Sequence, residues 1–427
     1  MSEWISCRLA DACASIDYGY TASASAAPVG PKFLRITDIV GNALRWESVP
    51  YVDANIRELE RYRLEHEDLV IARTGATTGE SYFIQNPPDA IFASYLVRLK
   101  IKQSFSPRFI AYWLKSPQFR TYLAGVLGDK SAQPNASAST MTNAPITLPA
   151  DKGYQRAIAS VLGALDDKIE LNRRMNDTLE AIARTIFKDW FVDFGPTRAK
   201  MEGRAPYLAP EIWSLFPDRL DDEGKPEGWS VGSLSDIAIL NPEGWTRANY
   251  PDCVNYVDLS NTKWGTIETI TQFTSDAAPS RAQRILRPGD TIVGTVRPGN
   301  GSYAFVSAKG LTGSTGFAVL RPIQGIYRET VYLAATSRDN IDRLAHLADG
   351  GAYPAVRPEL VTATELSYAS EGVFTAFSSA IGALIDRAEA NKRENRTLVA
   401  TRDFLLPKLM SGEVRLKDAE KLVGEAT

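Results

Sequence analysis

The chain has 427 residues, 44% of them hydrophobic and 23% charged, so it is long enough for two or three folded domains and is not expected to be disordered. No apolar run reaches the roughly 20 residues of a membrane span, no export signal is expected, and the three cysteines cannot all pair, so we expect a reduced, cytoplasmic protein. The two histidines are far apart in the sequence, and with only three cysteines they cannot form the usual zinc sites, so no metal is expected. The formal net charge of −3 excludes a uniformly basic nucleic-acid-binding domain.

The first predicted domain, 1–151, consists of short strands with turns and one helix. Runs rich in β-branched and aromatic residues, bounded by turn residues, indicate the strands. The predicted elements are strands 33–40, 68–72, 81–84 and 95–101 and a helix near 106–123.

Two segments of this domain carry side chains suited to contact a nucleic acid. The glycine-rich loop after strand 68–72 offers groups that reach base edges or phosphates, namely Arg73, Thr74, Thr77 and Thr78. The turn 131–135 offers Ser131 and Gln133, and a glutamine can pair with adenine. Each has a structural alternative: the loop as an ordinary turn, and the second segment as a proline-fixed entry into the closing strand.

The segment 152–192 predicts a long helix with a coiled-coil seam. From Ile158 to Trp190, seam residues follow one another at alternating spacings of four and three. Asn172 and Asn176 fall in the seam, where a buried amide penalises a wrong register. The connector that follows, 193–228, is rich in Pro and Gly and is expected to pack through Trp213 and Phe216.

The second predicted domain, 229–371, repeats the order of the first. Its predicted elements are strands 254–259, 291–294, 303–306 and 316–320 and a helix near 330–344. The matching loop offers Thr295, Arg297, Asn300 and Ser302, and the matching turn offers Tyr353, which can stack or donate.

The segment 372–412 predicts a second long helix and is followed by a tail, 413–427. The seam recurs from Phe377 to Leu409, with Asn391 and Asn395 in the places of the first two asparagines and one arginine, Arg402, in an apolar place. Pro407 is expected to end or kink this helix near its last turn.

Matched residues show that the chain is a tandem repeat. The separation of matched pairs falls steadily, from 225 residues between Trp4 and Trp229 to 222 between Asp68 and Asp290 and 219 between Gly163 and Gly382. We therefore predict an α+β fold in which two domains of mixed sheet and helix are separated by two long antiparallel coiled-coil helices with pseudo-twofold symmetry. The seam would span about 50 Å, more than the ~34 Å of one DNA turn. In the alternative, each helix packs onto its own domain and sets no fixed distance.

Basic residues gather at matching places of the two repeats. The stretch 90–128 has six basic residues and no acid, and 277–328 has seven and the single acid Asp290. A chance gap in the acids remains an alternative for either stretch, but their matching positions favour contact with phosphate.

These features together resemble the specificity subunits of type I restriction-modification systems. The resemblance rests on the repeat, the Asp68 and Asp290 strand-loop units, the Ala-Gln-Pro and Ala-Tyr-Pro turns, and Gly-Ala-Leu-x-Asp followed by two spaced asparagines and 187–191. It implies a chain without a catalytic site that reads a split target in double-stranded DNA, one domain per half-site. It also implies two methyltransferase subunits, which use S-adenosylmethionine, and restriction subunits as partners. Phe187, Trp190 and Phe191 are then candidates for partner binding, although the second copy differs there.

Two alternatives stay open at this point. One is a coiled-coil interaction protein that does not bind DNA. The other is a DNA methyltransferase, since Asn86-Pro-Pro-Asp89 is similar to the motif of adenine methyltransferases, but it has an acid in place of the aromatic residue and no cofactor-binding glycine unit before it. No Gly-Lys-Ser/Thr phosphate loop is present, which excludes the usual motor proteins.

Overall fold

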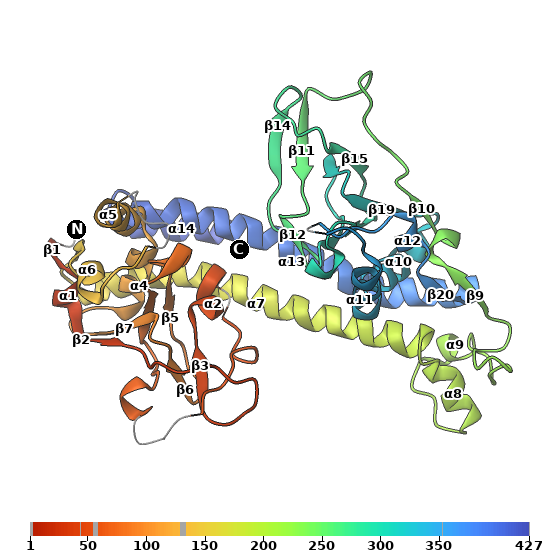
Figure 1. Cartoon of the computed structure of the whole chain (residues 1–427), viewed down its shortest axis with the longest axis horizontal. Helices are drawn as coiled ribbons and strands as arrows, with labels where there is room; N and C mark the ends of the chain where they lie inside the picture. The colour runs from red at the N-terminus through yellow and green to blue at the C-terminus, as the bar shows by residue number, and fades with distance from the viewer. Residues whose placement is uncertain (1–2, 43, 54–58, 129–133, 352, 427) are drawn as a thin grey trace. The chain divides into compact units, whose positions relative to one another are not determined.

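The computed structural model of the chain describes residues 3–42, 44–53, 59–128, 134–351 and 353–426. The chain divides into two compact units: unit 1 comprises Met1–Glu170 and Glu394–Thr427, and unit 2 comprises Leu171–Arg393. Each unit contains a strand-rich module and a part of two long helices, α7 (Lys152–Phe191) and α13 (Glu371–Ser411) (Figure 1). Among the described helices, none is both long and apolar enough to cross a membrane.

Unit 1 is built on a four-stranded antiparallel sheet in the order β2-β7-β4-β5. A second pair, β1 with β8, is antiparallel, and a third pair, β3 with β6, is parallel. The elements of its module are β1 (Trp4–Arg8), α1 (Leu9–Ala12), β2 (Cys13–Tyr18), β3 (Lys32–Leu34), α2 (Ile36–Ile39), η1 (Val40–Asn42), η2 (Glu60–Tyr62), β4 (Leu69–Ala72), η3 (Gly75–Thr77), β5 (Ser81–Phe83), β6 (Ala90–Phe92), β7 (Leu96–Ile101), α4 (Pro107–Lys115), α5 (Pro117–Leu127), α6 (Ala138–Thr142) and β8 (Pro145–Pro149).

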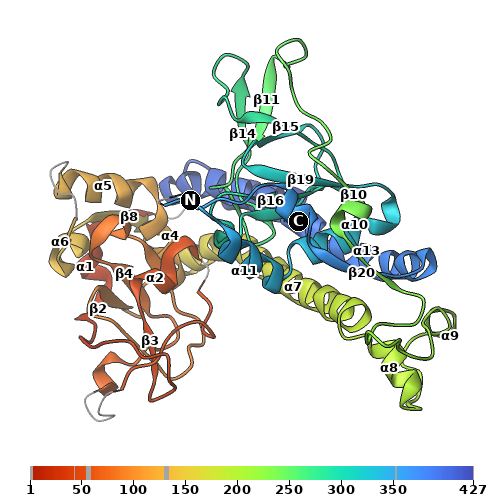
Figure 2. The ribbon, with the colours of Figure 1, turned by 45° about the vertical axis from the view of Figure 1, so that its right-hand side comes forward.

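Unit 2 repeats this plan and adds strands to it (Figure 2). The antiparallel sheet β10-β19-β16-β17, the antiparallel pair β9 with β20 and the parallel pair β11 with β18 match those of unit 1, and β14 and β15 extend the last pair to four strands. The elements of its module are β9 (Ser230–Ser233), η4 (Leu234–Asp236), β10 (Ala238–Leu240), β11 (Cys253–Val257), β12 (Thr262–Lys263), β13 (Thr266–Ile267), β14 (Thr271–Thr274), β15 (Ala282–Leu286), β16 (Thr291–Gly294), η5 (Pro298–Asn300), β17 (Tyr303–Phe305), β18 (Leu311–Ser314), β19 (Phe317–Pro322), η6 (Gly325–Tyr327), α10 (Arg328–Ala335), α11 (Arg338–Leu347), α12 (Glu359–Thr362) and β20 (Glu365–Tyr368).

Three predicted elements differ from the observed ones, each for a local reason. The strand predicted at 33–40 stops at Leu34, because Asp38 accepts the N–H of Arg35 at 2.8 Å and begins helix α2. The helix predicted at 106–123 breaks at Ser116, ahead of Pro117, into α4 and α5. The helix predicted at 330–344 likewise breaks, and Ser337 caps the start of α11.

The connector carries two short helices, α8 (Gly195–Met201) and α9 (Pro210–Trp213), and packs on unit 2. The ring of Phe216 lies 5.0 Å from that of Trp190, and Trp213 lies 5.4 Å from Tyr207. The tail ends in a further helix, α14 (Leu416–Ala426), whose Ala419 is buried in the core of unit 1.

Within each unit, α7 and α13 pack against each other and run in opposite directions. In unit 1, Lys168 contacts Glu394 at 3.3 Å, and Asp166 accepts a hydrogen bond from Arg402 at 2.8 Å. The pair of Arg402 with Asp166 thus gives the single arginine of the seam a partner of opposite charge. In unit 2, Phe377 packs against Phe187 at 6.1 Å between ring centroids. Because residue numbers rise along one helix as they fall along the other, the pairing is antiparallel, as predicted.

Seam asparagines lie between the helices. The amide of Asn391 donates to Oδ1 of Asn176 at 2.9 Å in unit 2, and that of Asn395 donates to the carbonyl of Ile169 at 3.3 Å in unit 1. Asn172 is fully buried. Pro407 does not end the helix, as one form of the prediction had it, because α13 continues past it to Ser411.

Candidate nucleic-acid interface

In unit 1 the two candidate segments lie against each other. The N–H of Gly75 donates to the carbonyl of Pro134 at 2.9 Å, and the N–H of Ala136 donates to the carbonyl of Arg73 at 2.8 Å. A β-bridge joins Thr74 to Asn135 between these bonds. The loop after β4 and the turn before α6, which are far apart in the sequence, therefore form one surface.

Unit 2 has the same two bonds at the positions that the repeat predicts. The N–H of Arg297 donates to the carbonyl of Pro354 at 2.7 Å, and the N–H of Val356 donates to the carbonyl of Thr295 at 2.9 Å. The two units thus share one backbone frame, in which a loop and a turn are fixed side by side while their side chains differ.

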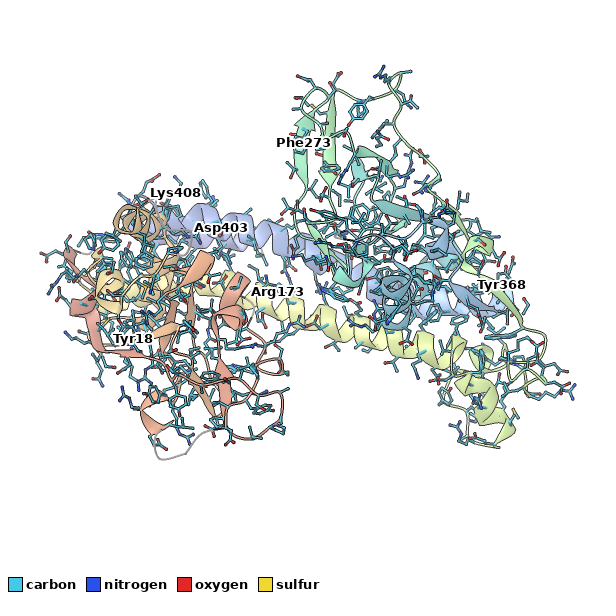
Figure 3. The ribbon with its side chains drawn as sticks, in the orientation of Figure 1. Tyr18, Arg173, Phe273, Tyr368, Asp403 and Lys408 are labelled. Carbon is cyan, nitrogen blue, oxygen red and sulfur yellow. The ribbon has the colours of Figure 1, made fainter. Side chains whose placement is uncertain are left out.

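Each frame holds an arginine against an aromatic ring. The guanidinium of Arg73 lies 4.9 Å from the ring centroid of Tyr18 and donates to Oδ1 of Asn135 at 3.2 Å. The guanidinium of Arg297 lies 4.7 Å from the centroid of Tyr353. These tyrosines are 42% and 72% exposed, so each frame presents an arginine-aromatic pair at the surface (Figure 3 labels Tyr18).

Three of the predicted DNA-binding hydroxyls are used inside the protein. Thr295 and Ser302 are 6% and 8% exposed, and their hydroxyls donate to backbone carbonyls at 2.9 and 3.0 Å. The hydroxyl of Thr78 donates to carbonyls of the loop and of the turn at 2.8 and 3.1 Å. We correct the prediction for Thr295 and Ser302: they hold the frame together, because a buried hydroxyl with a carbonyl partner is not available to a ligand. Thr78 is half-buried and remains a candidate.

The other predicted residues remain candidates. Asn300 is exposed, and Thr74 and Thr77 are half-buried. Ser131 and Gln133 lie outside the described residues.

Sequence reasoning missed three exposed aromatic residues near these loops. Besides Tyr18, they are Tyr95, 60% exposed, whose carbonyl accepts the N–H of Arg73 at 3.0 Å, and Trp264, 47% exposed, whose N–H donates to the carbonyl of Gly301 at 2.7 Å. A signal existed in the neighbouring Gly265, since glycine supplies the positive φ that a two-residue turn requires.

Several basic residues of the acid-poor stretches are paired. Arg98 contacts Asp17 at 2.8 Å, and Arg108 contacts Asp167 at 2.7 Å. In unit 2, Arg328 contacts Glu329 at 2.6 Å. Glu329 follows directly after the stretch 277–328, but the other two acids are distant in the sequence. A stretch without acids is therefore less basic in the folded protein than in the sequence, because acids from elsewhere in the chain pair with its arginines.

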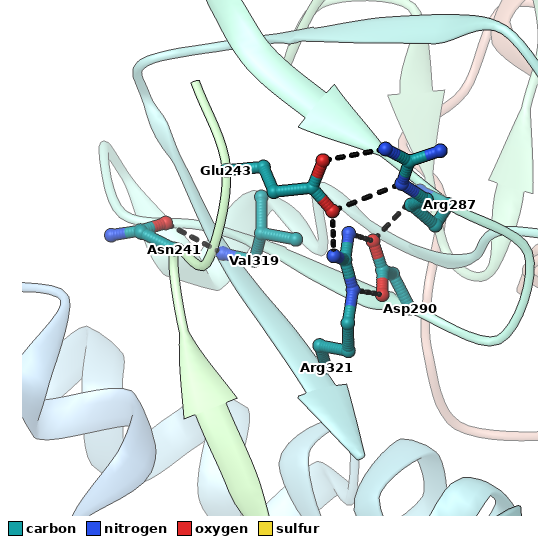
Figure 4. A network of polar contacts seen from close by, with 6 residues as sticks. All are labelled: Asn241, Glu243, Arg287, Asp290, Val319 and Arg321. Atoms are coloured by element: carbon teal, nitrogen blue, oxygen red, sulfur yellow. Dashed lines mark hydrogen bonds and ion pairs between the residues drawn. The ribbon is translucent and has the colours of Figure 1, made fainter. Parts of the chain in front are cut away.

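The strand before the loop of unit 2 is anchored by an ion-pair network around the buried Asp290 (Figure 4). Asp290, 1% exposed, accepts two hydrogen bonds from Arg321 at 2.8 and 2.9 Å. Glu243 accepts from Arg287 and Arg321, and these bonds lower the pKa of the Glu243 carboxyl to about 2. Oδ1 of Asn241 accepts the N–H of Val319 at 3.0 Å beside it.

The matching acid of unit 1, Asp68, shares one bond with Asp290 but lacks the close arginine. Asp68 accepts the N–H of Glu65 at 2.9 Å, as Asp290 accepts that of Arg287 at 2.8 Å, but the guanidinium of Arg98 lies 3.8 Å from Asp68. Burial raises the pKa of Asp68, which shows that desolvation outweighs this distant partner.

The aromatic residues predicted to bind partners lie mostly in the core of unit 2. Phe187, Trp190 and Phe191 are 8%, 2% and 2% exposed, and all three rings pack on Phe377. Trp190 therefore has a packing role, whereas edges of Phe187 and Phe191 line a surface cavity.

The Asn86–Asp89 segment is not placed as a catalytic motif would be. Asn86 and Asp89 are exposed in the turn between β5 and β6, and Asp89 pairs with Arg63. None of the described residues forms a cluster of three or more His, Cys, Asp or Glu side chains suited to a metal ion.

Comparison with known proteins shows which proteins the chain is similar to. Residues 1–181 match the family described as type I restriction modification DNA specificity domain. The chain is 23% identical to the type I restriction enzyme HindI specificity subunit of Haemophilus influenzae, over 97% of this chain and all of the relative. It is 24% identical to the MjaIX specificity subunit of Methanocaldococcus jannaschii, over 82% of this chain and 76% of the relative.

A solved structure shares the fold. The type I restriction-modification S subunit from M. genitalium matches with a TM-score of 0.57 and 15% identity, over 96% of both chains. The duplicated frame and the antiparallel helices therefore occur in a chain that is similar, over nearly its whole length, to a type I restriction-modification DNA specificity subunit, and whose residues 1–181 match the DNA specificity domain of that family.

Proposed function

We propose that this chain reads a bipartite sequence in double-stranded DNA, with the frame of unit 1 on one half-site and the frame of unit 2 on the other. The observation that carries the proposal is the loop-turn frame, present in both units with the same backbone hydrogen bonds and different exposed side chains. Arginine and amide groups on a fixed frame suit base edges in the major groove, where each base pair has its own donor and acceptor pattern. In this role the chain has no catalytic site and acts in the cytoplasm.

The paired helices would set the spacing of the half-sites. The 40 residues of α7 correspond to a helix of about 60 Å at 1.5 Å per residue. An antiparallel pair with amides in its seam resists slipping, because a shift would leave those amides unpaired.

Selection from a randomised duplex pool tests the proposal. The full chain is mixed with its methyltransferase partner and the pool, and bound duplexes are sequenced. We expect enrichment of one motif with two short specified parts and an unspecified spacer of fixed length. Enrichment of nothing, or of one continuous motif, would contradict the proposal.

Partner subunits would bind at two equivalent cavities. In unit 1, Asp403, Leu406 and Pro407 line a cavity of about 580 Å³. In unit 2, the residues 219 positions earlier, among them Arg184 and Lys188, line one of about 520 Å³. Since the repeat places one cavity in each unit, we infer two copies of one partner, a methyltransferase subunit that supplies S-adenosylmethionine chemistry, with restriction subunits added to that complex.

Charge reversal at each cavity tests this docking. We expect Asp403→Arg to remove one methyltransferase subunit and Lys188→Glu to remove the other, as measured by the mass of the assembled complex. Glu420→Arg, in the exposed face of α14, serves as the control and should keep both. If neither cavity variant changes the mass, the cavities are not the docking sites.

A further inference from the structure

An exposed tryptophan is fixed beside the loop of unit 2. Trp264 and Gly265 form the turn between β12 and β13, and both have a positive φ, 47° and 84°. Two such residues make the turn that best fits a two-residue hairpin, but a bulky side chain in this conformation is uncommon. The indole is 47% exposed. Backbone strain under an exposed aromatic ring is a feature of functional sites rather than of cores.

The turn is attached to the loop and to α13. The N–H groups of Trp264 and Gly265 donate to the carbonyls of Gly301 and Tyr303 at 2.7 and 2.9 Å. The ammonium of Lys392 donates to the carbonyl of Gly265 at 2.6 Å. A Cβ on Gly301 would lie 2.6 Å from the indole, so only glycine lets the ring pack this close to the loop. The ring is thus held before any ligand binds, which lowers the entropy cost of a contact.

A cation lies next to the ring. The guanidinium of Arg338 is 5.4 Å from a ring centroid of Trp264. Its ion pair with Asp342, at 3.0 Å, joins side chains that are 70% and 46% exposed, so little free energy is lost when Arg338 turns to another anion. Arg297 and Asn300 are exposed on the loop that Gly301 ends.

We propose that Trp264 and Arg338 form a second DNA contact of unit 2, which rests on the function proposed above. Arg338 contacts a phosphate of the second half-site, and the indole packs against the neighbouring sugar and base edge. Arg338 also lines the cavity of unit 2 at which we propose that a methyltransferase subunit binds. DNA is favoured for this contact because the backbone N–H of Trp264 donates to the end of the candidate reading loop. The turn of Trp264 lies between β11 and β16, which match β3 and β4 of unit 1. In the described residues between β3 and β4, unit 1 has the short helices α2, η1 and η2 in place of such a hairpin. We therefore assign this contact to the second half-site alone.

The test uses the full chain and the duplex enriched by the wild type from the randomised pool, with each half-site scrambled in turn. We expect Trp264→Ala to weaken binding roughly 5- to 100-fold through the second half-site only, and Trp264→Phe to recover most of the loss. Trp264→Asn gives the same loss with an intact turn, because asparagine tolerates a positive φ. Arg338→Ala should lower the slope of log affinity against log salt by about 1, whereas Trp264→Ala should leave the slope unchanged.

A matched control is Ile323→Ala, because Ile323 is an apolar residue that is 48% exposed, like Trp264. It follows directly after β19, which pairs with the edge strand β10, whereas the proposed contact lies near β17 at the other edge of this sheet. If Trp264→Ala and Trp264→Asn both bind the duplex like the wild type, the inference is wrong and the proposed function stands. The same holds if they change only the binding of the methyltransferase subunit. If the wild type enriches no duplex, the proposed function fails and the inference with it.

Discussion

Replacing Asp290 by Asn should destabilise unit 2, and replacing its repeat partner Asp68 should not destabilise unit 1 to the same extent. Asp290→Asn removes the charge from two hydrogen bonds of 2.8 and 2.9 Å to Arg321 and turns one amide N–H toward the guanidinium. Breaking a buried pair costs about 3–5 kcal/mol. Because Arg321 is 22% exposed and also bonds to Glu243, we expect a loss of about 2–3 kcal/mol.

Asp68→Asn is the matched control. The carboxylate of Asp68 is desolvated, which raises its pKa, and the nearest guanidinium contact is a distant one. The neutral amide of the variant avoids the cost of burying a charge and still accepts the N–H of Glu65. Arg98 keeps its bond to Asp17 at 2.8 Å. We expect a change within about 1 kcal/mol. Hydrogen exchange, read separately for the peptides of each sheet, measures both free energies. An equal loss in the two units would refute the reasoning from geometry.

Three further outcomes are expected. Arg297→Ala should relax discrimination at one base pair of one half-site by about 1–3 kcal/mol, as measured by competition with single-base variants, and an equal loss at both half-sites would mean that the units do not read independently. Deleting seven residues from each long helix should change the spacer selected from the random pool, and an unchanged spacer would rule out the helices as the ruler. The lowered pKa of Glu243 means that its stabilisation of unit 2 is fully present above pH ~4.5 and is lost as the pH falls through about 2, so acid unfolding of Glu243→Gln should depend less on pH in that window.

The repeat in the sequence was sufficient to predict the shared topology. Matched positions such as Asp68 and Asp290 directly precede equivalent strands, β4 and β16, of two sheets with the same strand order. The seam predicted the helix pairing for the same reason, since spacings of four and three place a stripe of residues on one face. What failed was local: Asp38 starts a helix in a run of residues that favours a strand, because one side-chain hydrogen bond outweighs propensity there.

The site was predicted less completely than the fold. The sequence indicated both loops and both turns, but not that backbone hydrogen bonds join them, because that contact depends on the tertiary fold. Nor does a hydroxyl in a loop reveal its direction: Thr295 and Ser302 face inward, while Asn300 between them is exposed. Trp264 lay in a segment for which we predicted no element.

The shared frame explains how two units of one design can read different sequences. Gly75 and Arg297 occupy equivalent positions, and both have a left-handed backbone, with φ of 76° and 48°. Unit 1 fills this position with glycine and carries its arginine two residues earlier, whereas unit 2 places the arginine itself there, at a backbone cost of about 1–2 kcal/mol. The guanidinium therefore leaves the two frames from different points, Arg73 toward Tyr18 and Arg297 toward Tyr353. If these arginines read base edges as proposed, a shift of two residues along a fixed loop would move the donor to another base pair, and specificity would change while every backbone bond of the frame is kept.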